Sequence, residues 1–100
     1  MVVMIEVNQL NVDGKTAFGL RVNLPDSPPL VAIIGEKGFV MCGFLNMESA
    51  ERIGMTAAMV SGVKTFDDVF NAEVKAVTSR AEKKGVRLGM KGREAVKLLF

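Results

Sequence analysis

Residues 30–45 read LVAIIGEKGFVMCGFL, which is two apolar runs, Leu30–Ile34 and Phe39–Leu45, joined by the turn Gly35–Gly38. Runs that are apolar at every position are typical of strands that are buried on both faces. The stretch therefore predicts two adjacent strands at the centre of a β-sheet, or strands that a partner subunit covers.

The residues before this stretch predict a β-hairpin. Val3, Ile5 and Val7 alternate with less apolar positions, and the apolar phase then slips at Asn8–Gln9, which indicates a β-bulge. Asp13–Gly14 is a strong two-residue hairpin signal, because both turn positions must accept a positive φ.

The return strand has one clearly apolar face. Phe18, Leu20 and Val22 share that face with Thr16 and Leu24, so we expect Phe18 to point into the core. The stretch Pro25–Pro29 holds three prolines and is expected to be a loop, since proline cannot donate to a central ladder.

The second half of the chain predicts mainly helices. The expected elements are a helix capped by Asn46 and stopped at Gly54, a further strand over Ala57–Val63, a short helix opened by the capping box of Thr65 and Asp68, a helix with Val74, Val77 and Ala81 on its buried stripe, and a last helix over Arg93–Phe100. Residues 1–100 are thus expected to form a single α+β domain with a mixed or largely antiparallel sheet.

Composition excludes several classes of function. The chain has 100 residues, of which 49% are hydrophobic, with a net charge of +2, one cysteine and no histidine. Without histidine, the usual general base and the commonest metal ligand are missing, so we expect no zinc or iron site and no cofactor. No basic leader and no apolar run of about 20 residues is present. We therefore expect a cytoplasmic protein.

Cys42 is the first candidate for chemistry. A reactive thiolate needs a nearby cation, a helix N-terminus or a base, and here Lys37, Lys64 or backbone amides would have to serve. Cys42 and Lys64 are therefore candidate catalytic residues. The alternative is a buried cysteine that acts as a small hydrophobe, with Gly43 present because another group approaches closely.

The basic stretch before the last helix is the second candidate. Lys91, Gly92 and Arg93 follow a glycine-rich turn and would lie at a helix N-terminus, which is favourable for an anion. The alternative is a solvated surface whose glycines only terminate helices.

The sequence gives less support to two further kinds of site, a metal site and a nucleic-acid site. Glu48 and Glu51 lie three apart on one expected helix and could hold Mg²⁺ or Ca²⁺ with help from other oxygens, but such pairs are more often surface carboxylates. Asp67 and Asp68 are expected in a first helical turn, where the helix dipole favours them. The six aromatic residues are all phenylalanine and are not framed by basic residues, so nucleic-acid binding is not favoured.

Three blocks together resemble the YunC-like family of small bacterial and archaeal proteins of unknown function. They are Lys37–Leu45, Gly62–Val69 and Gly89–Ala95. The resemblance implies a compact, self-associating α/β domain, and it marks Cys42, Lys64, Asp67 and Arg93 for testing without giving them a role. Lys91 stands where we expect a capping Thr or Ser in relatives, so the helix start is expected to be weaker or to use a bound anion.

Three functions stay open on the sequence. The leading one is a homo-oligomeric binding or structural protein for a small anionic ligand or a protein partner, since strands apolar on both faces leave surface that another subunit would hide. The alternatives are a thiol-dependent enzyme that uses Cys42 and a nucleic-acid accessory protein. No membrane partner is expected.

Overall fold

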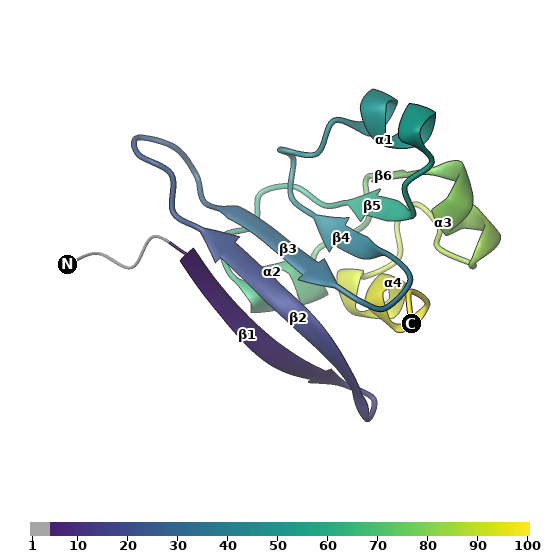
Figure 1. Cartoon of the computed structure of the whole chain (residues 1–100), viewed down its shortest axis with the longest axis horizontal. Coiled ribbons are helices and arrows are strands. Elements are labelled where there is room, and N and C mark those ends of the chain that lie inside the picture. Colours follow the sequence, from purple (N-terminus) through teal and green to yellow (C-terminus); the bar gives the residue numbers. More distant parts are fainter. Residues whose placement is uncertain (1–4) are drawn as a thin grey trace.

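A six-stranded mixed sheet with helices on both faces forms the domain (Figure 1). The computed structural model describes residues 5–100, so the expected alternation at Val3 lies outside the described residues. The strands follow one another across the sheet in chain order. The elements are β1 Ile5–Val12, β2 Lys15–Val22, β3 Leu30–Ile34, β4 Phe39–Met41, α1 Met47–Ile53, β5 Ala57–Met59, α2 Phe66–Asn71, β6 Ala76–Val77, α3 Ser79–Lys83 and α4 Gly92–Lys97.

The predicted α+β class is confirmed, and within residues 5–100 β4 and β5 are the one pair of neighbouring strands that run parallel. β4 and β5 can pair in parallel because the connection between them contains α1. A short turn reverses the chain direction and would make the two strands antiparallel. The two runs that predicted central strands are β3 and β4, the two middle strands of the sheet. No helix among residues 5–100 is long and apolar enough to cross a membrane.

The hairpin of β1 and β2 is regular from end to end. Asp13 and Gly14 form the predicted turn with φ values of 51° and 82°. Pairing continues without interruption from Val12↔Lys15 to Ile5↔Val22, so the predicted bulge was wrong. The apolar phase changes because Val12 faces the helices, whereas Ile5 and Val7 lie on the opposite, exposed face.

The orientation expected for β2 was also wrong. Ala17 is buried and Phe18 is 46% exposed, so the large apolar side chains of β2 point away from α2 and α4. The reason is the close approach of α2, because a Cβ at Gly19 would lie 2.7 Å from the Phe66 ring. Small residues face the helices for this reason, and the apolar stripe of Phe18 lies on the other side of the sheet.

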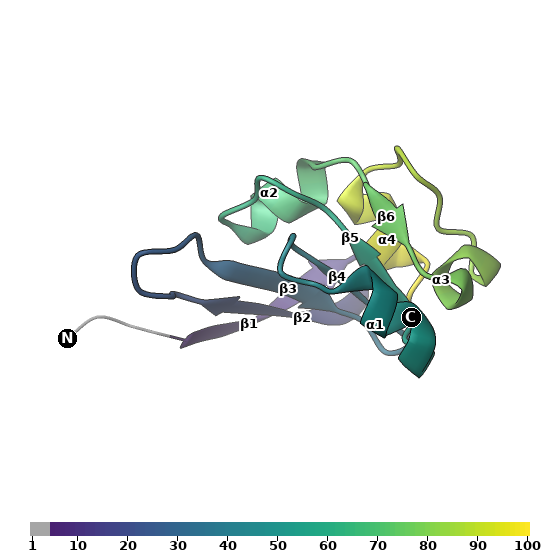
Figure 2. The same ribbon diagram turned by 90° about the horizontal axis from the view of Figure 1, so that it is seen from above.

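We call that other side the open face: the surface of β1–β4 opposite α2 and α4. Figure 2 shows α2 and α4 on one side of the sheet and α1 on the opposite side, near β4 and β5. Because paired residues point to the same face, the register assigns the open face its side chains. Across the four strands they are Ile5, Val7, Gln9 and Asn11; Thr16, Phe18, Leu20 and Val22; Leu30, Ala32 and Ile34; and Phe39 and Met41.

The helix caps follow the sequence closely. Asn46 accepts a hydrogen bond from the Ser49 N–H at the start of α1, and Gly54 ends that helix with a φ of 89°. Thr65 and Asp68 form the predicted capping box of α2. Both predictions are confirmed because they rest on local hydrogen bonds.

The helix predicted over Val74, Val77 and Ala81 is wrong in its first half. Ala76–Val77 is strand β6, which pairs with β5, and α3 begins only at Ser79. Thr78 caps this helix, since its hydroxyl accepts a hydrogen bond from the Ala81 N–H. The helical spacing of Val74, Val77 and Ala81 therefore does not mark one helix. Val77 belongs to a strand that pairs with β5, and Ala81 belongs to the helix that follows.

Candidate functional site

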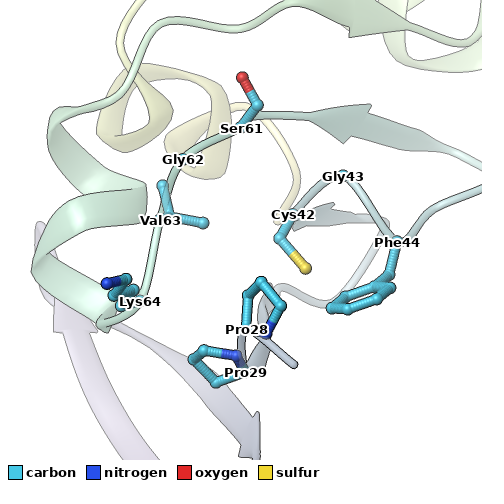
Figure 3. Close-up of a pocket in the computed structure, with 9 residues that line it drawn as sticks. All are labelled: Pro28, Pro29, Cys42, Gly43, Phe44, Ser61, Gly62, Val63 and Lys64. Atoms are coloured by element: carbon cyan, nitrogen blue, oxygen red, sulfur yellow. The ribbon is translucent and has the colours of Figure 1, made fainter. Parts of the chain in front are cut away.

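A pocket of ≈ 330 Å³ lies beyond the carboxyl ends of the parallel strands β4 and β5 (Figure 3). The carboxyl ends of parallel strands are the place where open α/β sheets commonly bind ligands. The two loops that follow these strands and the loop before β3 supply the walls, and we call this cavity the Cys42 pocket. Its lining residues are Pro28, Pro29, Cys42, Gly43, Phe44, Ser61, Gly62, Val63 and Lys64.

Cys42 is a buried residue at the inner wall of this pocket. It is 5% exposed, and Figure 3 shows its sulfur directed toward Pro28. Its Sγ accepts a hydrogen bond from the Val31 N–H at 3.4 Å, and its own N–H donates to the Val31 carbonyl at 3.0 Å. Two hydrogen bonds to Val31 therefore hold Cys42 in place, and a small part of the residue stays exposed.

Gly43 does not have the packing role that the sequence suggested. A Cβ built on Gly43 would meet no atom within 4 Å, so the expectation of a close approach was wrong. Gly62, across the pocket, has a φ of +72°, which favours glycine for conformational reasons. Gly43 has no such requirement, and the absence of a side chain there keeps the space beside Cys42 open.

Lys64 lines the same pocket but does not reach the thiol. Figure 3 shows its side-chain nitrogen pointing away from the Cys42 sulfur. Its backbone is held firmly, because its N–H donates to Asp68 Oδ2 at 3.0 Å and its carbonyl accepts from Arg21 Nε at 2.8 Å. The structure thus brings both predicted catalytic residues to the lining of one cavity, and the charge of the Lys64 ammonium also acts on the neighbouring Asp68 carboxylate.

Several backbone donors are available around the pocket. Among residues 5–100, the N–H groups of Gly43, Phe44, Ser61 and Gly62 have no hydrogen-bond acceptor, and all four residues are exposed. Backbone N–H groups in loops are good donors to an oxygen that carries negative charge. The lining of the pocket therefore includes apolar side chains, residues whose backbone N–H groups are unpaired, and one lysine.

Asp68 lies beside this site as a structural group. The Lys64 N–H, and after it Thr65, donates to its carboxylate and holds the pKa of Asp68 below its ordinary value of 3.8. Asp68 is thus charged at neutral pH and orders the loop that carries Lys64. Asp67, which the resemblance marks for testing, is exposed in the first turn of the same helix.

The predicted anion site at Lys91, Gly92 and Arg93 is not part of the Cys42 pocket. The Gly92 N–H already donates to the Ala72 carbonyl at 2.8 Å, and the Lys91 side chain makes no capping hydrogen bond. The Arg93 guanidinium stacks 4.3 Å from the centre of the Phe70 ring. Gly92 has a packing role, since a Cβ there would overlap the carbonyl oxygen of Val69.

The other candidates also have structural partners. Glu51 accepts a hydrogen bond from the Ser79 N–H at 2.8 Å, which lowers the pKa of Glu51 from its ordinary 4.5. The described part of the chain contains no cluster of three or more His, Cys, Asp or Glu side chains suited to a metal. The Lys37 N–H donates to the Leu99 carbonyl at 2.7 Å, and Lys37 does not line the Cys42 pocket.

Sequence reasoning missed most of the pocket wall. The sequence placed Pro28 and Pro29 in a loop and Phe44 in a strand. It placed Val63 at the end of another strand. The expected strand ran over Ala57–Val63, but β5 ends at Met59. Gly62 within that apolar run was the one signal that the strand stops early and a loop begins.

The fold and site define a single α+β domain with a small pocket at the carboxyl ends of its parallel strands. Residues 41–99 match the domain of unknown function DUF1805. The chain is 31% identical over 97 residues to the uncharacterized protein YunC of Bacillus subtilis, which covers 93% of this chain and 95% of that protein. It therefore belongs to the DUF1805, or YunC-like, family, as the sequence resemblance predicted.

A solved structure shows the same fold. The crystal structure of TA1206, a protein of unknown function from Thermoplasma acidophilum, superimposes with a TM-score of 0.91 at 35% sequence identity. The match covers 97% of this chain and 94% of the other. At this identity and coverage, the whole domain and its strand order are common to both proteins.

Proposed function

We propose that this protein is a binding domain for a small, largely apolar molecule that carries one carboxylate or other anionic oxygen, held in the Cys42 pocket. The observation that carries the proposal is the position of an apolar cavity, with unpaired backbone donors at its edge, at the carboxyl ends of β4 and β5.

The size and the walls of the pocket limit the ligand. Small-molecule sites have volumes of about 300–1,000 Å³ and are mostly apolar with a few polar groups. At ≈ 330 Å³, the Cys42 pocket is at the small end of that range. Pro28, Phe44 and Val63 offer apolar contact, so the ligand is expected to have a short hydrocarbon or single-ring body.

The polar edge specifies the charged end of the ligand. The N–H groups of Gly43 and Gly62 have no intramolecular acceptor within residues 5–100, and Lys64 is the one cationic residue in the pocket lining. Hydrogen bonds from these groups to a carboxylate are charge-assisted and stronger than those to a neutral oxygen. An anionic ligand is therefore favoured over its neutral counterpart.

Nuclear magnetic resonance titration with simple carboxylates tests this proposal. Benzoate and butyrate are added to ¹⁵N-labelled protein, with benzyl alcohol and butanol as uncharged counterparts. We expect the amide signals of Gly43, Phe44 and Gly62 to shift with the carboxylates and less with the alcohols. If neither carboxylate shifts these signals, the proposal is contradicted.

Two matched lysine variants locate the anion. Lys64→Gln removes the cation at the pocket, and Lys91→Gln removes the cation at the start of α4. We expect Lys64→Gln to weaken benzoate binding by roughly tenfold, which corresponds to about 1.4 kcal/mol, and Lys91→Gln to leave it unchanged. The opposite result would place the anion at Lys91–Arg93, where the sequence predicted it.

A thiol-dependent enzyme is the second candidate, because Cys42 lines the pocket. The test is incubation with p-nitrophenyl butyrate, whose acyl group a reactive thiolate takes up while p-nitrophenolate leaves. An enzyme of this kind gives a burst of p-nitrophenolate and a butyrylated Cys42 by mass spectrometry, and Cys42→Ser removes the burst. A binding domain gives neither. Nucleic-acid binding stays a prediction. An affinity for nucleic acid that does not fall as the salt concentration rises would contradict it.

A further inference from the structure

We propose that the ligand of the Cys42 pocket is a planar aromatic carboxylate, and that Phe44 is the residue that selects its ring. The inference rests on the proposed binding function and adds to it the chemical class of the ligand. The observation that carries it is an exposed aromatic side chain at the wall of an apolar cavity, in a turn that does not need one.

Phe44 lies in a tight turn just after the carboxyl end of β4. The Leu45 N–H donates to the Cys42 carbonyl at 3.2 Å, so that Gly43 and Phe44 are the central residues of this turn. Such positions are commonly held by Gly, Pro, Asn, Asp or Ser, each of which has a conformational or hydrogen-bonding reason to be there. Phenylalanine has no such reason, so the local backbone does not account for Phe44.

Packing of the core does not account for Phe44 either. Phe44 is 49% exposed, and within residues 5–100 it belongs neither to the buried core nor to the partly buried residues that pack against that core. An exposed ring forgoes the hydrophobic free energy that its burial would contribute. At the wall of a concave site, in contrast, aromatic side chains are a common feature, because a ligand covers them.

The other apolar wall of the pocket is rigid. Pro28 and Pro29 line the same cavity, and Figure 3 shows their rings and the Phe44 ring on different sides of it. A proline side chain has no rotamer freedom to lose when a ligand covers it, and its ring also fixes the backbone φ.

A small rigid cavity favours a rigid ligand. The free energy needed to order a flexible group is subtracted from the affinity, and an alkyl chain has several bonds to order where a benzene ring has none. At ≈ 330 Å³ the pocket is also near the lower limit for small-molecule sites. A body of one ring therefore suits the pocket better than a longer chain.

A planar ring gains more from Phe44 than a saturated ring of the same size. Two aromatic rings in offset or edge-to-face contact gain free energy beyond that of the area they bury. The Phe44 N–H also has no acceptor within residues 5–100. One residue thus offers a ring for the body of the ligand and a backbone donor for its carboxylate.

Binding of two ring acids measures this selection. Benzoate and cyclohexanecarboxylate have the same carbon count and the same charge, but only benzoate is planar and aromatic. Titration of ¹⁵N-labelled protein, followed at the amide signals of Gly43 and Gly62, gives a dissociation constant for each acid. We expect benzoate to bind about fivefold more tightly than cyclohexanecarboxylate, which lies within the range of aromatic pair energies.

Phe44→Leu tests whether Phe44 is the origin of the preference. Leucine keeps an apolar side chain at the pocket but removes the ring, so we expect benzoate to lose about fivefold in affinity and cyclohexanecarboxylate to bind as before. Phe18→Leu is the matched control and is expected to keep the preference, because Phe18 is 46% exposed on the open face and does not line the pocket. The ratio of the two dissociation constants does not depend on the fraction of folded protein, so a loss of stability alone leaves it unchanged.

A nuclear Overhauser effect between the ring protons of benzoate and those of Phe44 reports the contact in the wild type and needs no variant. We expect to observe it, and its absence at saturating benzoate overturns the role of Phe44. Equal binding of the two acids, or a preference that Phe44→Leu keeps, overturns the inference while the proposed binding function stands. If neither acid shifts the amide signals of the pocket, the proposed function falls and the inference falls with it.

Discussion

At the scale of single residues, the glycines fall into two kinds: those that close packing requires and one that leaves space beside the candidate site. Gly92 and Gly19 are glycine because another part of the chain occupies the space of a Cβ: the Val69 carbonyl oxygen in one case and the Phe66 ring in the other. Gly43 has free space around it, and that space is continuous with the Cys42 pocket. Sequence alone cannot separate these roles, because the approaching group comes from a distant segment.

Gly92→Ala is expected to destabilise the protein strongly. Its Cβ would overlap the Val69 carbonyl oxygen, which belongs to the backbone of α2 and cannot move aside cheaply. Overpacking of this kind costs about 2–3 kcal/mol in the free energy of unfolding, measured by urea denaturation. Gly43→Ala is the control and is expected to change that free energy by less than about 0.5 kcal/mol. Equal effects of the two variants would contradict the assigned packing of α4 on α2.

Two carboxylates predict the acid response of the fold. The pKa values of Glu51 and Asp68 are lowered by backbone hydrogen bonds from Ser79 and Lys64. Because the folded pKa is depressed, the stability these groups contribute is complete above their ordinary values of 4.5 and 3.8. It is lost as the pH falls through the lower, folded values.

Urea unfolding at neutral and acid pH measures this dependence. The wild type is expected to lose free energy of unfolding as the pH falls below about 4.5, and the double variant Glu51→Gln, Asp68→Asn is expected to lose less. Asp67→Asn is the control, since no hydrogen bond to the Asp67 carboxylate is present within residues 5–100. A double variant with the same pH dependence as the wild type would refute this assignment.

At the scale of elements, Thr78 joins β5 to α3. Its buried hydroxyl accepts from the Ala57 N–H at 3.1 Å and the Ala81 N–H at 3.3 Å, and it donates to the Ala57 carbonyl at 3.3 Å. One side chain therefore ends a strand, begins a helix and fixes the angle between them. It also sets the place where the chain leaves β6.

Thr78→Val is expected to lower the free energy of unfolding by about 1–3 kcal/mol, because it keeps the shape but leaves buried backbone groups without a partner. Chemical denaturation monitored by circular dichroism measures the change. Thr16→Val, at an exposed strand position, is expected to change it by less than about 0.5 kcal/mol. A neutral Thr78→Val would show that its hydroxyl is not needed to join the two elements.

The sequence predicted those elements whose signals are local. The Asp13–Gly14 turn, the Asn46 cap and the Thr65–Asp68 capping box each depend on residues at most three apart. The prediction from sequence failed where contacts between distant segments determine the local structure. Examples are β6, which exists because β5 pairs with it, and the orientation of β2, which depends on the approach of Phe66.

The candidate site was predictable only in part, for the same reason. Cys42 and Lys64 stood out by residue type, but their shared pocket requires the parallel pairing of β4 and β5. The third wall, Pro28–Pro29, comes from the loop before β3, and nothing in the local sequence connects it to Gly62. Three segments meet here because the sheet brings their ends together.

At the scale of the whole molecule, the two faces of the sheet have different roles. Helices α2 and α4 bury one face, and the open face carries exposed apolar side chains such as Val7 and Phe18. The Cys42 pocket lies beyond the carboxyl ends of β4 and β5.

The homo-oligomer expected from the sequence predicts a melting temperature that depends on protein concentration. Over a roughly 100-fold range of concentration, the wild-type Tm is expected to rise, because association stabilises only the folded chain. The Tm of Phe18→Lys is expected to stay constant over the same range. Differential scanning calorimetry measures both, and a wild-type Tm that does not change with concentration would contradict self-association through the open face.

The rate at which iodoacetamide labels Cys42 under native conditions shows whether the Cys42 pocket is open, because the chain has one thiol and that thiol lines the pocket. If the pocket is open, Cys42 is labelled slowly and at a rate that does not change at low urea concentration. Gly43→Leu is then expected to block this labelling by filling the entrance. Labelling that rises with urea in step with global unfolding, and that Gly43→Leu does not slow, would show that Cys42 is closed core and that no ligand site exists there.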